Sequence, residues 1–102
     1  MWSPMATGGD DLDRLFSALG DPTRRRILER LDARAGLTTG ELAAAVPGLT
    51  RYAVMKHLEV LRRAGLVQTL PEGRRRRHYP IEPALEPVTA WLARRPRQRS
   101  PG

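Results

Sequence analysis

The sequence predicts a mostly helical domain that carries one small β-hairpin near its C-terminal end. Three observations predict this fold class. Apolar residues recur at helical spacing in five segments. Most of these segments are bounded by residues that typically begin or end helices. Between residues 66 and 81 the helical spacing stops, and two strand-like stretches flank a Pro-Glu-Gly turn.

The first two helices are predicted from their apolar stripes and their ends. The first runs from Asp10 to Gly20, and its stripe comprises Leu12, Leu15, Phe16 and Leu19. The second begins at Asp21-Pro22, because aspartate is a good N-cap and proline suits the first helical position. Its buried face is expected to comprise Ile27, Leu28, Leu31 and Ala35. Gly36-Leu37 is expected to close it with a left-handed glycine cap.

The next two helices are predicted to form a helix-turn-helix. Thr38 and Glu41 have the spacing of a capping box, which opens a short helix that ends at Pro47-Gly48. Thr50 caps a longer helix, which Gly65-Leu66 closes. The apolar stripe of this longer helix comprises Val54, Leu58 and Leu61. A short helix, a tight turn and a longer helix with a polar, basic and aromatic front indicate a helix-turn-helix.

The hairpin and one more helix complete the predicted fold. Residues 66–70 form the first strand, and Pro71, Glu72 and Gly73 form the turn that follows it. Residues 75–81 can pair back onto the first strand. Pro80 cannot donate to a strand ladder, so the returning strand is expected to end at Tyr79. A last helix follows Pro83. Its apolar face comprises Leu85, Val88, Trp91 and Leu92.

The length and the charge distribution limit what the chain can do. Its 102 residues suit one folded domain at residues 10–94, between a disordered N-terminus at 1–9 and a disordered basic tail at 95–102. Residues 1–50 hold 6 basic and 7 acidic residues, whereas residues 51–102 hold 12 and 4. A concentrated basic region is typical of proteins that bind polyanions. Because seventeen of the eighteen basic residues are arginine, a GC-rich genome could also contribute to this excess.

Several other classes of protein are not expected. The absence of cysteine excludes disulfides and thiolate metal sites and fits a cytoplasmic protein. No run of about 20 apolar residues predicts a membrane-spanning helix, and the first eleven residues do not resemble a secretory signal. No nucleophile–base pair or phosphate-binding glycine loop indicates an enzyme.

The predicted order, α-α-α-α-β-β-α, is the winged helix-turn-helix arrangement, and the sequence resembles the ArsR-type bacterial transcriptional regulators. The resemblance covers roughly residues 12 to 93. It is carried by the segments LFSALGDPTRRRIL (15–28), ELA (41–43), AVMKHL (53–58), LRRAGLV (61–67) and GRRR (73–76), and by Tyr79. It implies that residues 10–94 form a DNA-binding and dimerisation domain. The expected protein is a nucleoid-associated homodimer that binds an inverted-repeat operator in double-stranded DNA and usually represses.

The candidate DNA-binding residues lie on the longer helix and on the hairpin. Residues near the start of such a helix reach base edges in a major groove, whereas arginines of the wing are expected to contact phosphates or the minor groove. The candidates are Thr50, Arg51, Tyr52, Met55, Lys56, His57, Arg74, Arg75, Arg76 and Arg77. His57 could instead pack locally. Tyr52 and Met55 replace the short polar residues usual in the family. The operator sequences of the family therefore cannot be transferred to this protein.

The resemblance also implies that the first and last helices build the dimer interface. The candidate residues are Leu12, Leu15, Phe16, Leu19, Val88, Trp91 and Leu92, and some of them must also serve the core of the protomer. Phe16 and Trp91 are favoured, because large aromatic side chains concentrate at interface cores. Arg24, Arg25 and Arg26 are expected to make structural ion pairs with neighbours such as Asp21 and Glu29.

No metal site and no cofactor are expected. Metal-sensing relatives carry a cysteine pair on the short helix of the helix-turn-helix, which is replaced here by Glu41-Leu42-Ala43-Ala44-Ala45, and the last helix has no histidine. An effector ligand remains unassigned. Two alternatives stay open: a nonspecific or architectural DNA-binding protein, and a winged-helix module that binds another protein.

Overall fold

Five α-helices, one short 3-10 helix and three strands make up the described part of the chain. The computed structural model describes the backbone of residues 7–96 and the side chains of residues 11–96. The elements in order are α1 (Thr7–Leu19), α2 (Pro22–Ala33), β1 (Leu37–Thr38), α3 (Thr39–Ala45), α4 (Arg51–Arg63), β2 (Val67–Glu72), β3 (Arg75–Pro80), η1 (Glu82–Leu85) and α5 (Glu86–Arg94). This is the predicted mostly helical winged helix-turn-helix, with one additional short strand.

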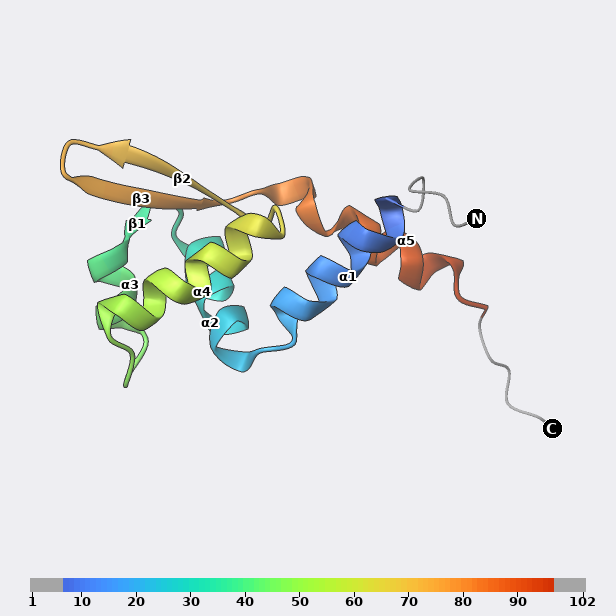
Figure 1. The fold of residues 1–102 in the computed structure, drawn as a ribbon, viewed down its shortest axis with the longest axis horizontal. Helices are drawn as coiled ribbons and strands as arrows, with labels where there is room; N and C mark the ends of the chain where they lie inside the picture. The colour runs from blue at the N-terminus through green and yellow to red at the C-terminus, as the bar shows by residue number, and fades with distance from the viewer. Residues whose placement is uncertain (1–6, 97–102) are drawn as a thin grey trace.

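The elements form two parts that lie along the long axis of the molecule (Figure 1). Helices α2, α3 and α4 lie under a three-stranded antiparallel sheet of order β1-β3-β2. Helices α1 and α5 lie against each other and extend away from this body toward the opposite end. The resulting shape is long and flat, 56 × 41 × 21 Å.

The hydrophobic core lies within the helix-turn-helix body. The predicted apolar stripes of α2 and α4 are buried: Ile27, Leu28, Leu31, Val54, Leu58 and Leu61. Leu15 and Ala18 of α1 join them, whereas α5 contributes no fully buried residue. None of the helices in the described part of the chain has the length and the apolar character of a membrane-spanning helix.

The predicted caps hold the helices in place. The Asp21 carboxylate accepts from the Arg24 N–H at 3.0 Å, and the Thr50 hydroxyl accepts from the Ala53 N–H at 3.1 Å. Thr38 and Glu41 form the complete capping box of α3. After α4, Gly65 has φ +78°, and the Leu66 N–H donates to the Leu61 carbonyl at 2.9 Å. The helix-turn-helix therefore begins and ends where local chemistry predicts.

The end of α2 differs from the prediction. Gly36 does have a positive φ, but its N–H donates across to the His78 carbonyl of β3 at 2.8 Å. The next two residues form β1, with Leu37 opposite His78. Ala35, predicted to be buried, is exposed. The chain leaves α2 to add an edge strand to the hairpin, so this glycine serves the sheet rather than a helix cap.

The hairpin is longer and its turn tighter than predicted. β2 continues through Pro71 and Glu72, and only Gly73 and Arg74 form the turn. Gly73 has φ +61° and Arg74 does not have a positive φ, which is the pattern of a type II′ turn. β3 includes Pro80, contrary to the expected end at Tyr79. Successive N–H groups of a strand point to alternate sides, and the next residue, Ile81, donates to the Leu66 carbonyl at 3.0 Å. The nitrogen of Pro80 therefore points away from β2, so the ladder tolerates this proline.

The ends of the domain also differ in part from the prediction. α1 begins at Thr7, so residues 7–9 are helical and not part of a disordered N-terminus. α5 ends at Arg94, and the guanidinium of Arg95 lies 5.0 Å from the centroid of the Trp91 ring. The rest of the predicted tails, residues 1–6 and 97–102, lies outside the described residues.

Candidate nucleic-acid interface

The N-terminal half of α4 presents its polar, aromatic and basic side chains outward. The helix buries its back in the core, so the opposite face is left to solvent. Tyr52 is 68% exposed and Met55 is 58% exposed, and Arg51 and Lys56 beside them are exposed too. Four of the predicted contact residues therefore form one accessible surface on the first two turns of α4.

Two contacts order this surface. The Arg51 guanidinium lies over Gly40 of α3, since a Cβ added to Gly40 would be 3.6 Å from Arg51 Nη2. Among the described residues, Arg51 makes no hydrogen bond or ion pair, so its donors can serve a ligand. Lys56 Nζ lies 5.4 Å from the centroid of the Tyr52 ring, which is a cation–π distance.

The hairpin of β2 and β3, called the wing below, carries the arginine run. Arg74, Arg75 and Arg76 are exposed at its tip, and no described side chain pairs with them. Arg77 differs, because its Nε donates to Glu72 at 2.8 Å and its Nη1 donates to the Gly36 carbonyl at 2.9 Å. The hydrogen bond with Glu72 raises the pKa of Arg77. The geometry therefore favours a structural role for Arg77, which ties the wing to the loop before β1.

An open groove of about 810 Å³ separates the wing from α4. Its charged lining consists of one acidic residue, Glu41, and five basic residues: Arg51, Arg62, Arg74, Arg75 and Arg76. Residues of α4, of the start of α3 and of the wing complete its walls: Met55, Leu58, Thr38, Thr39, Gly40, Thr69 and His78. The pKa of Glu41 is lowered, chiefly by the N–H of Thr38, so this carboxylate stays ionised within its capping box. The groove is strongly positive and suits a polyanion.

His78 is a key residue of this region that the sequence analysis did not single out. It is buried on β3, where its Nε2 lies 2.9 Å from the Thr39 hydroxyl and its Nδ1 lies 2.8 Å from the Thr69 hydroxyl. Burial and the charges of Arg62 and Arg76 lower the pKa of His78 to about 4. A neutral imidazole therefore links both strands of the wing to the first residue of α3.

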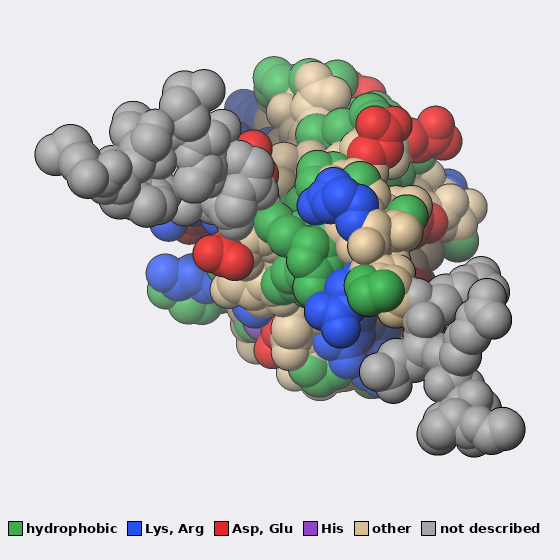
Figure 2. Space-filling view, turned by 90° about the vertical axis from the view of Figure 1, so that its right-hand side faces the viewer, with side chains coloured by type: hydrophobic (Ala, Val, Ile, Leu, Met, Phe, Trp, Pro, Cys, Tyr) green, Lys and Arg blue, Asp and Glu red, His purple; other side chains and the backbone are tan. Residues whose placement is uncertain are grey.

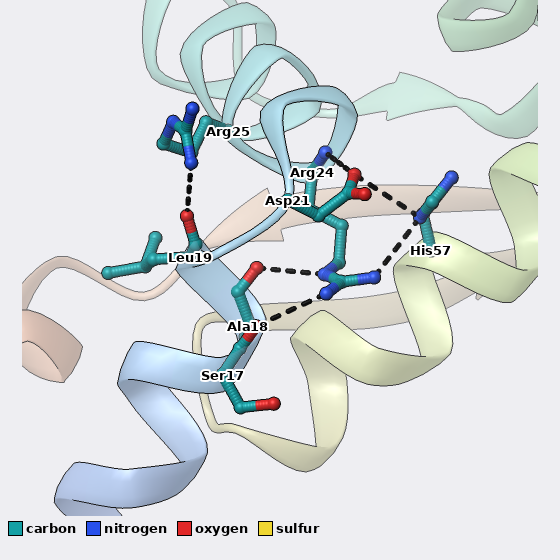
Figure 3. A network of polar contacts seen from close by, with 7 residues as sticks. All are labelled: Ser17, Ala18, Leu19, Asp21, Arg24, Arg25 and His57. Atoms are coloured by element: carbon teal, nitrogen blue, oxygen red, sulfur yellow. Dashed lines mark hydrogen bonds and ion pairs between the residues drawn. The ribbon is translucent and has the colours of Figure 1, made fainter.

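His57 belongs to a different environment from the other residues of α4. It is half-buried, and its Nδ1 lies 3.5 Å from Arg24 Nη1 and 4.0 Å from the Asp21 carboxylate (Figure 3). Of the two roles possible for His57, local packing is the one that this geometry favours.

Arg24 and Arg25 of α2 do not make the expected ion pairs. They donate to backbone carbonyls at the end of α1.

The α1–α5 pair is the second surface of interest. Phe16 and Trp91 make an edge-to-face contact, with ring centroids 5.7 Å apart and planes at 81°. Phe16 is nevertheless 42% exposed and Leu92 is 58% exposed. The view onto this end of the molecule shows a hydrophobic patch between basic side chains (Figure 2).

The other candidate interface residues are less accessible. Leu12, Leu19, Val88 and Trp91 are half-buried. Leu15 is buried in the protomer, so its predicted place at an interface is corrected to the core. Sequence periodicity marks the apolar face of α1 but does not divide it between core and exterior. Within residues 11–96, no group of three or more metal-ligating side chains comes together.

The chain is similar to known helix-turn-helix regulators. A family model described as "Helix-turn-helix domain" matches residues 19–69. The transcriptional regulator Rv2034 of Mycobacterium tuberculosis is 49% identical over 71 residues, which cover 70% of this chain and 64% of the relative. The uncharacterised regulator YuzN of Bacillus subtilis is 45% identical over 86 residues, which cover 78% and 94%.

The fold gives the same assignment. The crystal structure of an ArsR family transcriptional regulator, RHA00566, superposes with a TM-score of 0.75 at 36% identity, covering 83% of this chain and 86% of that one. The chain thus spans most of YuzN and of RHA00566, but less than two thirds of Rv2034. The family and the fold are those of transcriptional regulators and not of enzymes. Its helix-turn-helix, its arginine wing and these relatives show that the chain belongs to the ArsR-type family of winged helix-turn-helix transcriptional regulators.

Proposed function

We propose that this protein binds an inverted-repeat operator in double-stranded DNA as a homodimer and represses transcription there. The observation that carries the proposal is the positive groove between the exposed front of α4 and the wing. A B-DNA major groove accepts an α-helix, and the residues near the start of that helix reach the base edges. In a bacterial cell such a protein acts in the cytoplasm, at the nucleoid.

The α4 surface is the proposed base-reading element. Arg51 and Lys56 can donate to guanine O6 and N7, and Met55 can contact the methyl group of thymine. Tyr52 lies beside Lys56 and is large enough to contact bases or sugars. Thr50 already accepts a hydrogen bond from Ala53, and its own hydroxyl hydrogen can donate to a phosphate.

The wing is the proposed backbone-binding element. Arg74, Arg75 and Arg76 project from a tight turn, so they can follow the phosphates beside the major groove or enter the minor groove. Arg77 is left out of this interface because its hydrogen bonds to the Glu72 carboxylate and the Gly36 carbonyl hold its guanidinium against the protein. His57 is left out because it faces Arg24.

The α1–α5 pair is the proposed dimer interface. It exposes Phe16 and Leu92 on a part of the molecule that has little core of its own. Covering such a patch with a second copy removes apolar surface from water. A two-fold dimer would place two α4 helices in successive major grooves, about 34–36 Å apart.

A gel-shift titration at two salt concentrations tests the proposed function. The protein is titrated against its own promoter and against a scrambled duplex of the same length and composition. We expect the promoter to retain a clear advantage at the higher salt concentration, since base contacts do not depend on counterion release. If the affinities for both duplexes fall equally at the higher salt concentration, the protein is a nonspecific DNA-binding protein and not a sequence-specific regulator. Absence of binding to any duplex at low salt would favour the protein-binding alternative.

A further inference from the structure

A polar junction joins three helices at the point where α1 meets the body of the domain (Figure 3). α1 ends at Leu19 and α2 begins at Pro22, so only Gly20 and Asp21 connect them. The last carbonyl groups of a helix lack helical partners and carry the negative end of its dipole. The last turn of α1 contains no basic residue of its own, and α2 supplies the missing donors instead.

Arg24 of α2 contacts both neighbouring helices with one guanidinium group. Its Nε donates to the Ala18 carbonyl at 2.8 Å, and its Nη2 donates to the Ser17 carbonyl at 3.1 Å. Its Nη1 points the other way and lies 3.5 Å from His57 Nδ1 on α4. Because the guanidinium is planar and its donors are fixed relative to one another, these contacts set the end of α1 against α4.

Asp21 completes the junction. Its carboxylate accepts from the Arg24 N–H at 3.0 Å and lies 4.0 Å from His57 Nδ1. The hydrogen bond from the Arg24 backbone lowers the pKa of Asp21, so the carboxylate is charged near neutral pH. Asp21, Arg24 and His57 are all half-buried, which weakens screening by salt.

We propose that Arg24 is a positioning residue that fixes the direction of α4 relative to the α1–α5 pair. The inference rests on the proposed function, in which that pair joins two protomers. In such a dimer the α1–α5 pairs of the two protomers are packed together, and this packed unit is called the frame below. The angle between α1 and α4 at the junction then sets the separation of the two α4 helices. Leu15 and Ala18 anchor α1 by apolar packing, which is not directional. The hydrogen bonds of Arg24 supply the directional restraint.

Distance measurement between spin labels tests this inference on the whole protein without DNA. The chain has no cysteine, so Arg63→Cys introduces a single label at the exposed end of α4 in each protomer. Pulsed electron resonance then reports the distance between the two α4 helices of a dimer. We expect one narrow distribution in the otherwise wild-type protein and roughly twice that width in Arg24→Ala, because α4 gains freedom to rotate against the frame.

Two neighbouring arginines provide matched controls. Arg26→Ala removes the same charge from the same helix, but no described residue accepts a hydrogen bond from Arg26. Arg25→Ala removes a bond to the Leu19 carbonyl without touching α4. Both variants should keep the narrow distribution. A broader distribution in Arg26→Ala would assign the effect to charge alone and overturn the role of Arg24.

Operator spacing gives a second readout that a purely structural role would not change. The wild-type protein should lose roughly tenfold in affinity when two base pairs are inserted between half-sites, because one helix then lies out of register with its groove. Arg24→Ala should lose about threefold or less, with unchanged preference for bases within a half-site. His57→Leu, which removes the α4 side of the junction, should behave like Arg24→Ala. It is the substitute if Arg24→Ala does not fold.

The outcomes separate the two proposals. If the wild-type protein forms no dimer or prefers no operator, the proposed function fails and this inference fails with it. If the wild-type protein dimerises and shows a spacing optimum, the proposed function stands. A folded Arg24→Ala or His57→Leu dimer with the wild-type distribution and spacing profile then overturns the positioning role alone.

Discussion

At the scale of residues, side chains of one type divide into those that hold the fold and those that face outward. Arg77 and Arg76 are neighbours, yet Arg77 is bonded to Glu72 and Gly36 while Arg76 lines the open groove. Arg24 likewise bridges α1 and α4, whereas Arg26 on the same helix is exposed. The folded backbone decides which guanidinium groups remain available to DNA.

Arg51 and Arg75 are expected to make different contributions to DNA binding. Arg51→Ala should reduce discrimination between the operator and a mismatched site by about 1–3 kcal/mol, since a bidentate base contact is lost. Arg75→Ala should weaken binding to all duplexes about equally and flatten the salt slope by about one unit, because one phosphate contact is lost. Fluorescence anisotropy over a salt series measures both quantities. Identical behaviour of the two variants would contradict the division between base reading and phosphate binding.

His78 is expected to make folding stability depend on pH. Its folded pKa of about 4 lies below the ordinary value of 6.5, so the unfolded chain binds the proton more readily. The contribution of His78 to folding stability should therefore be complete above about pH 6.5. It should decrease as pH falls toward 4, with a loss of about 2.5 kcal/mol at pH 4.5. Urea denaturation at a series of pH values measures this loss.

His78→Gln is the control for that pH dependence. Glutamine keeps polar atoms near Thr39 and Thr69 but does not titrate. The variant should be less stable than the wild-type protein at pH 7, and its stability should fall less steeply between pH 6.5 and 4. An equally steep decrease would assign the pH dependence to other groups.

At the scale of elements, the sequence predicts features that depend on neighbouring residues. It does not predict features that depend on pairing between distant segments. The capping box of Thr38 and Glu41 lies within four residues, so the sequence predicts α3 directly. The pairing of His78 with Thr69 depends instead on the strand register. A turn at Gly73-Arg74 gives that register, whereas the predicted three-residue turn would pair His78 with another residue.

The strand β1 was missed for the same reason. Two residues carry too little periodicity to indicate a strand, and Leu37 and Thr38 become one only because β3 lies beside them. His57 shows the corresponding limit at the candidate site. Helical spacing places it on the shoulder of α4, but its partner Arg24 comes from another helix.

The end of α4 gives a test at this scale. Gly65→Ala should destabilise the protein by about 1 kcal/mol, because alanine is strained at φ +78° even though its Cβ would meet no atom within 4 Å. Gly40→Ala is the matched control in α3, where a Cβ would make only ordinary contacts with Arg51. It should be neutral or stabilising by up to about 1 kcal/mol. Urea denaturation at one fixed protein concentration compares the two, and equal stability of the variants would contradict the role of Gly65.

At the scale of the whole molecule, the two parts of the structure have different sources of stability. The helix-turn-helix body has a closed core, whereas α5 has no fully buried residue and shares its contacts chiefly with α1 and η1. A helix without a fully buried residue, such as α5, is stabilised when a second surface covers it. The proposed dimer therefore links the stability of the α1–α5 pair to the concentration of the protein.

Leu92→Glu tests that link. Leu92 is exposed on α5, and a carboxylate there would have to lose water in the proposed interface, so the variant should be monomeric at concentrations where the wild-type protein is a dimer. Sedimentation measures the oligomeric state. Over a tenfold range of protein concentration, the melting temperature of the wild-type protein should shift and that of Leu92→Glu should not. Leu70→Glu changes an exposed leucine of the wing in the same way and should leave the dimer intact. A dimeric Leu92→Glu variant would place the interface elsewhere, and a monomeric Leu70→Glu variant would move it toward the wing.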